Sequence, residues 1–427
     1  MAAPSSPVPP RRLGLVDLLA LGVNAVVGAG VFLMPGLLAE KLGPAAVVAT
    51  LTAGLSALVL ALSTAEAASR FDDTGGPYLY AREAFGPGPG FLVGWVVSWT
   101  GLIAWAALLA SFATALSFFL PATAGGWPRA AAILGLAALL GALNVLGIHR
   151  GALVSNLASV AKLGVLVVFV VIGLPAADLA RFEPFAPHGF AHLPEATLLM
   201  LYAYVGFENL IVPAGEMKTP RRHLPVALCA VMATVLLLYL GVQVVSTATL
   251  PDLAGKANPV AEAARALLGP AGGTLIGAGV LVSILGVNAA SAIIAPRRFH
   301  AMAAKGELPA WLARLHPERA TPWAAIAFTY GLATVLALSG SFRQLAVVTV
   351  ASRLLQYAAT CLAVLALRRR APAPFRLPGG PLLPGLGLAV CVGLATAAGK
   401  RELLAAALVV GSGLAVWWGL LRNRAER

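Results

Sequence analysis

Two glycine-containing breaks interrupt long apolar runs of this sequence. Gly28-Ala29-Gly30 lies within GVNAVVGAGVFLMPG, and Val205-Gly206 lies within LYAYVGFENLIVPAGEMKTP. Glycine disfavours a helix by about 1 kcal/mol relative to alanine and lets another backbone or a ligand approach closely. At such a break, freed amides suit a carboxylate and freed carbonyls suit an ammonium group. Together the breaks could bind an amino acid, although the first alone would fit an ordinary close contact between helices.

Lys162 is the most unusual charged residue, because it lies about ten residues into the apolar run 153–175. A lysine near the middle of a bilayer costs at least about 2.5–3.5 kcal/mol, so it requires a partner. Snorkelling is disfavoured because roughly 15 Å separate the midplane from either interface. Lys162 is therefore a candidate for ion or proton coupling, with a static structural contact as the alternative.

Two further charged residues fall within apolar runs. Glu208 directly follows the second break, where it would either take up a proton or hydrogen-bond the freed amides. Arg353 lies within the run 344–367 and would either pair with an internal acid or line a pathway.

Other polar residues lie near the ends of the runs. Glu66, Glu216 and the Arg297-Arg298 pair would form salt bridges at a gate or loop, with solvent-exposed charges as the alternative. The cysteines lie far apart in apolar runs, and none of the six histidines lies in mid-run. We therefore expect no metal site and no embedded enzyme. The three cysteines are Cys229, Cys361 and Cys391.

The composition identifies the solvent in which these residues work. Of the 427 residues, 59% are apolar and 11% are charged, and the mean hydropathy is +0.87. A soluble chain has about a quarter charged residues. This chain has too few to cover its apolar content, which excludes a cytosolic enzyme, a disordered protein and a nucleic-acid binder. It is predicted to be an integral membrane protein.

About twelve apolar runs are long enough to cross a bilayer as helices. The two breaks fall in the first and sixth runs, and corresponding breaks in two halves are typical of inverted-repeat transporters. The runs lie near 13–38, 43–68, 89–119, 129–147, 153–175, 195–215, 224–247, 271–294, 322–339, 344–367, 380–398 and 402–421.

The basic residues predict the orientation. The chain has 30 Lys and Arg against 17 Asp and Glu, a net charge of +13. Most of the 30 fall in segments that are cytoplasmic if both termini are cytoplasmic, as the positive-inside rule requires. The charge therefore indicates orientation and contact with anionic lipid rather than nucleic acid. The compact loops and the lack of a cleavable signal favour a bacterial inner membrane.

Four segments resemble, in the same order, motifs of the amino acid–polyamine–organocation superfamily of transporters. They are GVNAVVGAGVFLMPG, AEAASRFDDTGGPYLYAREAFG, GFENLIVPAGEMKTPRRHLP and APRRFHAMAAKGELP. The second departs from the superfamily pattern at Asp72-Asp73, where a proline is common. The resemblance implies an all-α fold with a five-plus-five inverted repeat, broken first and sixth helices and two extra helices. The repeats would be 13–175 and 195–367, the extra helices 380–421, and the tails 1–12 and 422–427.

The resemblance also implies roles for individual residues. A substrate carboxylate would meet the amides of the first break, and its ammonium group would meet carbonyls of both breaks. Tyr202 would close over the substrate as a gate, with interior packing of Tyr202 and Tyr204 as the alternative. Tyr239 is a further candidate, and Lys162 would replace the sodium ion of sodium-coupled relatives. The implied substrate-binding residues are Val26, Gly28, Ala29, Gly30, Tyr202, Val205 and Gly206.

We therefore predict a secondary active amino acid transporter that is sodium-independent and acts as a proton-coupled symporter or an exchanger. A nucleotide-binding P-loop is absent from the sequence. Few acids besides Glu208 lie on helices expected around the cavity, which favours a neutral amino acid. The alternatives are a polyamine or organic-amine carrier of the same fold, a channel, or a non-transporting sensor. We expect no cofactor, and either a monomer or a homodimer.

Overall fold

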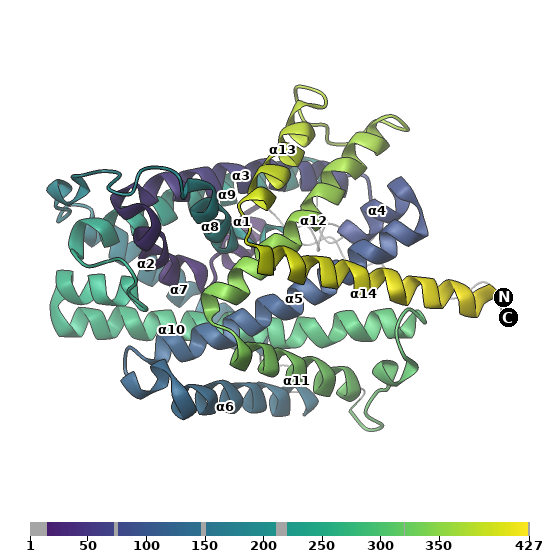
Figure 1. Ribbon diagram of the computed structural model, residues 1–427, viewed down its shortest axis with the longest axis horizontal. Coiled ribbons are helices and arrows are strands. Elements are labelled where there is room, and N and C mark those ends of the chain that lie inside the picture. Colours follow the sequence, from purple (N-terminus) through teal and green to yellow (C-terminus); the bar gives the residue numbers. More distant parts are fainter. Residues whose placement is uncertain (1–14, 72–75, 147–150, 211–219, 320, 426–427) are drawn as a thin grey trace.

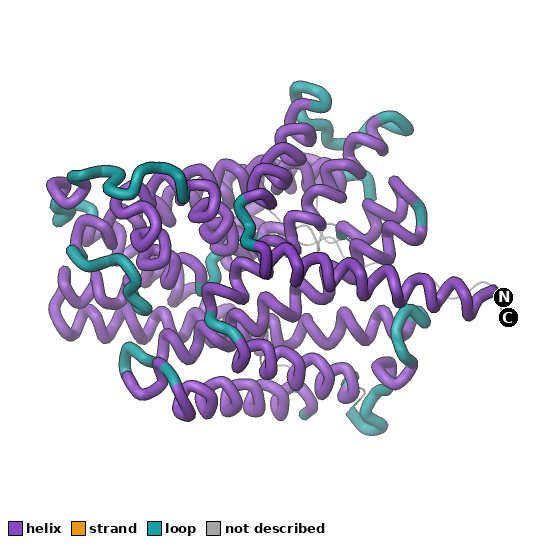
Figure 2. Tube along the Cα trace, viewed as in Figure 1, coloured by secondary structure: helices purple, strands orange, loops and turns teal. Residues whose placement is uncertain are grey.

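The structure is a computed structural model that describes residues 15–71, 76–146, 151–210, 220–319 and 321–425. Throughout these ranges the chain is helical or forms loops, and no strand occurs in them (Figures 1 and 2). The first seven helices are α1 (Leu15–Val26), α2 (Gly30–Leu42), α3 (Ala46–Ala68), α4 (Pro77–Phe85), α5 (Pro87–Leu116), α6 (Gly126–Val145) and α7 (Gly151–Gly173). The others are α8 (Leu193–Tyr204), α9 (Pro220–Thr249), α10 (Pro259–Ala304), α11 (Trp323–Ser339), α12 (Phe342–Arg368), α13 (Leu382–Thr396) and α14 (Lys400–Ala425).

A helix occupies each of the apolar runs expected from the sequence, and the first run contains two helices. Seven of the described helical segments are long and apolar enough to cross a membrane. Two features were not expected. The short helix α4 lies between α3 and α5, and α10 continues for 46 residues, well beyond the run 271–294. Gly269, with φ 75°, kinks α10 near its start.

Local sequence explains several helix starts. Proline is the first residue of α4, α5, α9 and α10, where its missing N–H group costs no helical hydrogen bond. Ser341 and Gln344 begin α12 with reciprocal hydrogen bonds between side chain and backbone, at 3.2 and 2.9 Å. This capping box satisfies two amides that would otherwise lack partners.

Small residues let the central helices approach closely. A row of fully buried alanines runs along α3, which packs against α8 and α9. Leu51 and Leu55, by contrast, are 40% and 48% exposed. Small residues at helix contacts and large apolar side chains outside them are the pattern expected where lipid covers the outer surface. The buried alanines are Ala46, Ala49, Ala53, Ala57 and Ala61.

The breaks lie inside this packed bundle. Helix α1 packs on α9, α2 packs on α8, and α12 packs on both α5 and α8. In Figure 1, α5 crosses the middle of the molecule beside α10, and α14 extends beyond the bundle. Segments that are far apart in sequence therefore surround both breaks.

Candidate functional site

The predicted interruptions are both present. Helix α1 ends at Val26 and α2 begins at Gly30. Helix α8 ends at Tyr204, Val205 is extended, and Gly206 has φ 126° before a short 3-10 turn over Phe207–Leu210. The described chain stops at residue 210 and resumes at 220, so the end of the sixth run (195–215) and Glu216 after it lie outside the described residues.

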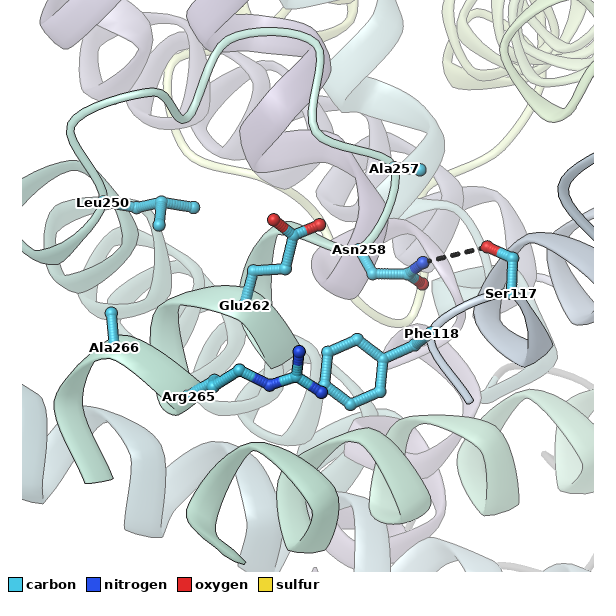
Figure 3. A pocket seen from close by; sticks show the side chains of 8 residues that line it. All are labelled: Ser117, Phe118, Leu250, Ala257, Asn258, Glu262, Arg265 and Ala266. Atoms are coloured by element: carbon cyan, nitrogen blue, oxygen red, sulfur yellow. Dashed lines mark hydrogen bonds between the residues drawn. The ribbon is translucent and has the colours of Figure 1, made fainter. Parts of the chain in front are cut away.

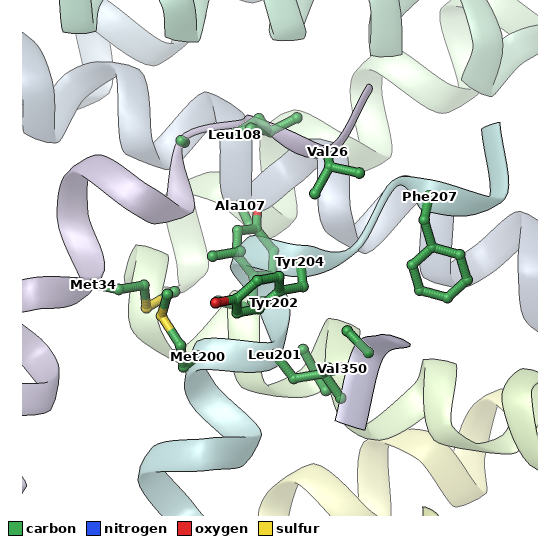
Figure 4. Close-up of a cluster of buried hydrophobic side chains, with 14 of the residues drawn as sticks. Val26, Met34, Ala107, Leu108, Met200, Leu201, Tyr202, Tyr204, Phe207 and Val350 are labelled. Carbon is green, nitrogen blue, oxygen red and sulfur yellow. The ribbon is translucent and has the colours of Figure 1, made fainter. Parts of the chain in front are cut away.

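The two breaks are in contact with each other. A Cβ atom on Gly30 would lie 2.7 Å from both Cα and Cβ of Ala203, and one on Gly206 would clash with the carbonyl oxygen of Ala25. Glycine is therefore required at both positions by the neighbouring backbone, and at Gly206 also by the positive φ. Val26 of the first break and Phe207 of the second are drawn in the same buried cluster as Tyr202 and Tyr204 (Figure 4).

The first break leaves backbone donors available. Val27 N donates to Val23 O at 2.9 Å as the last bond of α1, and Phe32 N donates to Ala29 O at 3.2 Å as α2 begins. Within the described part of the chain, no backbone carbonyl accepts from the amides of Ala29 or Gly30. These amides are at the N-terminus of α2, where a carboxylate is stabilised by hydrogen bonds and by the helix dipole.

Tyr239 of α9 links the two breaks through its hydroxyl group. This oxygen lies 3.3 Å from Val26 O and 3.0 Å from Ala203 O. The side chain is 1% exposed. Tyr239 therefore fixes the end of α1 against α8. It also contacts the Val26 carbonyl, one of those that the resemblance assigns to the substrate ammonium group.

Tyr202 and Tyr204 occupy different environments. The hydroxyl of Tyr204 donates to Thr50 O at 3.1 Å, and its side chain is fully buried. Tyr202 is 8% exposed and packs edge-to-face on Phe342 of α12, with ring centroids 5.5 Å apart. Tyr204 is thus anchored in the interior, whereas Tyr202 keeps some free surface and touches a different helix.

Lys162 reaches the first break. Its side chain is 2% exposed, and Nζ donates to Val27 O at 2.6 Å. Val27 is the residue directly after α1, so α7 holds one of the carbonyls that the break releases. A charge-assisted hydrogen bond of this length is a strong one. The structure thus supplies a partner for Lys162.

The second break carries an ion pair. Glu208 Oε1 pairs with the guanidinium group of Arg353, and Glu208 Oε2 accepts from Gly206 N at 3.1 Å. Tyr357 donates to Oε2 at 3.5 Å, and its ring stacks on Phe207 at 5.4 Å. Both proposed contacts are found here, Arg353 with an internal acid and Glu208 with a freed amide. Tyr357 was missed, although its spacing of four from Arg353 places both on one helix face.

The sequence of this chain matches a known family of membrane proteins over nearly its whole length. A sequence profile described as "Amino acid permease" matches residues 13–421. The chain belongs to the amino acid permease family. This confirms the resemblance to the amino acid–polyamine–organocation superfamily, whose members are membrane transporters.

Curated relatives cover most of this permease. It is 28% identical to the branched-chain amino acid permease BcaP of Bacillus subtilis, over 90% of this chain and 87% of that one. It is also 28% identical to the serine/threonine exchanger SteT of Bacillus subtilis, over 97% and 98% respectively. The chloroplastic cationic amino acid transporter 9 of Arabidopsis thaliana is 32% identical over 72% of this chain and 58% of that one.

At one end of the permease, Glu66 forms the expected salt bridge. It is fully buried, and Arg368 Nε donates to its Oε1 at 2.6 Å. Leu377 N donates to Oε2 at 2.9 Å, and Arg70 Nη2 lies 3.8 Å from Oε1. This network fixes the C-terminal ends of α3 and α12 and the following loop.

Arg297 and Arg298, also predicted to form salt bridges, instead donate to backbone carbonyls. Arg297 Nη1 donates to Ile293 O of its own helix at 2.6 Å, and Arg298 Nη1 donates to Val97 O of α5 at 3.5 Å. Among the described residues neither arginine forms an ion pair. Main-chain carbonyls take the place of the expected acids.

The ends of α2 and α8 that point away from the breaks are joined to each other. Lys41 Nζ lies 2.5 Å from Glu195 Oε1, and Arg343 of α12 lies 3.2 Å from Glu40 Oε1. Partly exposed pairs of this kind contribute about 0–1 kcal/mol each. They connect α2 to α8 and to α12 but add little to the stability of the fold.

A pocket of about 490 Å³ lies beside the loop between α9 and α10 (Figure 3). Asn258 donates to Ser117 Oγ at 3.2 Å, and Arg265 stacks over the Phe118 ring at 4.5 Å. In the same loop, a hydrogen bond from Lys256 lowers the pKa of Asp252. Gly255 N donates to Gly36 O of α2 at 3.1 Å, so the loop rests directly on the half-helix that begins at the first break.

Proposed function

We propose that this permease is a secondary active amino acid transporter that binds its substrate between the two breaks and exposes it alternately to each side. The observation that carries the proposal is the direct contact of the breaks at Gly30–Ala203 and Gly206–Ala25. Interrupted helices that meet inside a membrane bundle offer the backbone groups that substrate binding needs, and rocking around them would change access.

In this proposal the substrate carboxylate binds the amides of Ala29 and Gly30, which donate to no described backbone carbonyl. The ammonium group binds the carbonyls of Val26, Tyr202 and Val205. Two of these also accept hydrogen bonds from the protein, Val26 from Tyr239 and Tyr202 from the Val205 amide. Gly30 and Gly206 allow the two breaks to approach closely, and Gly28 leaves open space at the first break. Tyr202 acts as the gate, and Tyr239 holds α1 to α8.

We further propose a twelve-span architecture with both termini cytoplasmic, in the inner membrane of a bacterium. Residues 13–175 and 195–367 would be the inverted repeats, 380–421 the two extra helices, and 1–12 and 422–427 the tails. Helices in all twelve apolar runs and the matched interruptions of the first and sixth runs support this arrangement.

Sodium-independent coupling is proposed from Lys162. Its ammonium group meets Val27 O at the end of α1, which is where a coupling cation would stabilise the break. Lys162 and Glu208 are the candidate coupling groups, and transport would be proton symport or exchange. The relative SteT is a serine/threonine exchanger, which favours exchange over symport for this permease.

The substrate is proposed to be a neutral amino acid. Two relatives are named for branched-chain amino acids and for serine and threonine, but another is named for cationic amino acids, so family membership does not decide which substrate side chain is bound.

Binding of each of the twenty amino acids to purified protein, followed by uptake into proteoliposomes in sodium and in choline buffer, tests the proposal. Saturable uptake that is equal in both buffers and stimulated by internal substrate would support it. Strict sodium dependence would contradict the coupling, non-saturable flux would indicate a channel, and binding without flux would indicate a sensor.

A further inference from the structure

We propose that Arg353 is a specificity-determining residue that excludes substrates with a cationic side chain, because it occupies the carboxylate of Glu208. This inference rests on the proposed function, since it assumes that substrate binds at the breaks. It assigns the ion pair a role in choosing among amino acids, beyond the backbone contacts that recognise all of them.

The position of Glu208 makes it a natural partner for a substrate. It lies two residues after Gly206, and its Oε2 accepts from Gly206 N at 3.1 Å. Gly206 in turn contacts Ala25 at the end of the first break. The carboxylate is therefore attached to the same backbone turn that brings the two breaks together.

Arg353 approaches this turn from α12. Val350, one helical turn earlier, is labelled in the same cluster as Leu201, Tyr202 and Phe207 (Figure 4). The Arg353 and Glu208 side chains are 12% and 11% exposed, so the pair keeps surface that a ligand can reach. Arg353 Nε is buried and has no hydrogen-bond partner among the described residues, so Glu208 satisfies the guanidinium group only in part.

The electrostatics follow from this arrangement. An unpaired carboxylate in a low-dielectric site attracts a cationic ligand strongly, whereas a carboxylate already paired with a tethered guanidinium presents little net charge. A lysine or arginine substrate would have to displace Arg353 and leave it buried without its partner. Lys162 at the first break adds a second positive charge near the site. Such a repulsive element discriminates between ligands as effectively as an added contact.

Three variants test the inference by competition of L-lysine and L-glutamate against a neutral amino acid that the wild-type protein binds. Arg353→Gln frees Glu208, and we expect the affinity for L-lysine to rise at least about tenfold. Glu208→Gln frees Arg353, and we expect the affinity for L-glutamate to rise similarly. The double variant Glu208→Gln/Arg353→Gln is the matched control, and we expect neither gain.

Removing one member of a buried pair can destabilise a protein, so folding is checked by thermal unfolding of each variant. If Arg353→Gln does not fold, the L-glutamate result for Glu208→Gln decides. A folded single variant whose charge selectivity equals that of the wild type would overturn the inference, as would a wild type that binds L-lysine as tightly as neutral amino acids. Failure of the wild type to bind any amino acid would instead overturn the proposed function.

Discussion

The two breaks differ in how their freed backbone groups are satisfied. At the first, the amides of Ala29 and Gly30 have no backbone acceptor among the described residues, and the Lys162 ammonium group of another helix donates to the freed carbonyl of Val27. At the second, the protein supplies its own acceptor, because Glu208 receives the Gly206 amide two residues earlier. The first break is therefore open to a carboxylate, while the second is closed by a side chain that itself needs Arg353. In the proposed transporter, the first break would bind the carboxylate that all amino acids share, and the second would contact the side chain that varies.

The largest expected effect is at the closed break. Gly206→Ala places a Cβ atom against the Ala25 carbonyl and forces a side chain into φ 126°. The backbone strain alone costs about 1–3 kcal/mol, so we expect both a lower unfolding temperature and the loss of transport. Thermal unfolding and uptake by proteoliposomes measure the two effects. Unchanged stability would mean that the breaks do not touch as described.

The second prediction concerns Lys162, which contacts the first break. Lys162→Ala removes the donor to Val27 O, and we expect loss of any dependence of uptake on a pH gradient, with exchange retained at most. The measurement is uptake with and without an imposed gradient, compared with counterflow. Lys162→Arg, which keeps a charge that does not titrate near neutral pH, is the control. If uptake by Lys162→Ala still responds to a pH gradient, Lys162 is not the coupling group, and Glu208 or another residue must carry the proton.

The gate prediction compares Tyr202 and Tyr204, which are separated by one residue. Tyr202→Ala should lower uptake at least about tenfold, because the ring that rests on Phe342 would no longer cover the site. Tyr202→Phe keeps the ring and should transport normally. Tyr204→Phe removes the bond to Thr50 O and should cost about 0.5–1.5 kcal/mol of stability with transport retained. If Tyr202→Ala unfolds as readily as it loses transport, packing is the better explanation of its position.

The smallest expected effects are those of alanine substitutions at the two glycines of the first break, Gly28 and Gly30. A Cβ atom on Gly28 meets only Val26 O, at 3.9 Å, so Gly28→Ala should leave the unfolding temperature unchanged and weaken substrate binding severalfold at most. Gly30→Ala would press on Ala203 at 2.7 Å and should lower stability as well. Paired thermal unfolding and binding assays compare the two variants. Equal destabilisation by both would remove the distinction between open space and close contact.

This contrast changes the reason for one sequence-based expectation. The resemblance places Gly30 where the substrate carboxylate binds, so on that ground alone a bulky residue there would block binding. In the structure the nearest obstacle is Ala203 of α8, so even a methyl group has a structural cost before any substrate is considered. The sequence indicates a break at Gly30, but it does not identify Ala203 as the neighbour that requires a glycine there.

The sequence by itself determined the helices and the places where they fail. Apolar runs of membrane length predict helices because their backbone has no other hydrogen-bond partners in lipid, and glycine clusters mark where that pattern stops. It also determined that Lys162 must have a partner, since a mid-bilayer charge is too costly to leave alone. Only the tertiary structure decided which partners are used. The links Tyr239–Ala203, Lys162–Val27 and Arg353–Glu208 join residues on different helices. Their pairing depends on how helices pack and rotate against one another, and hydrophobic periodicity does not encode that.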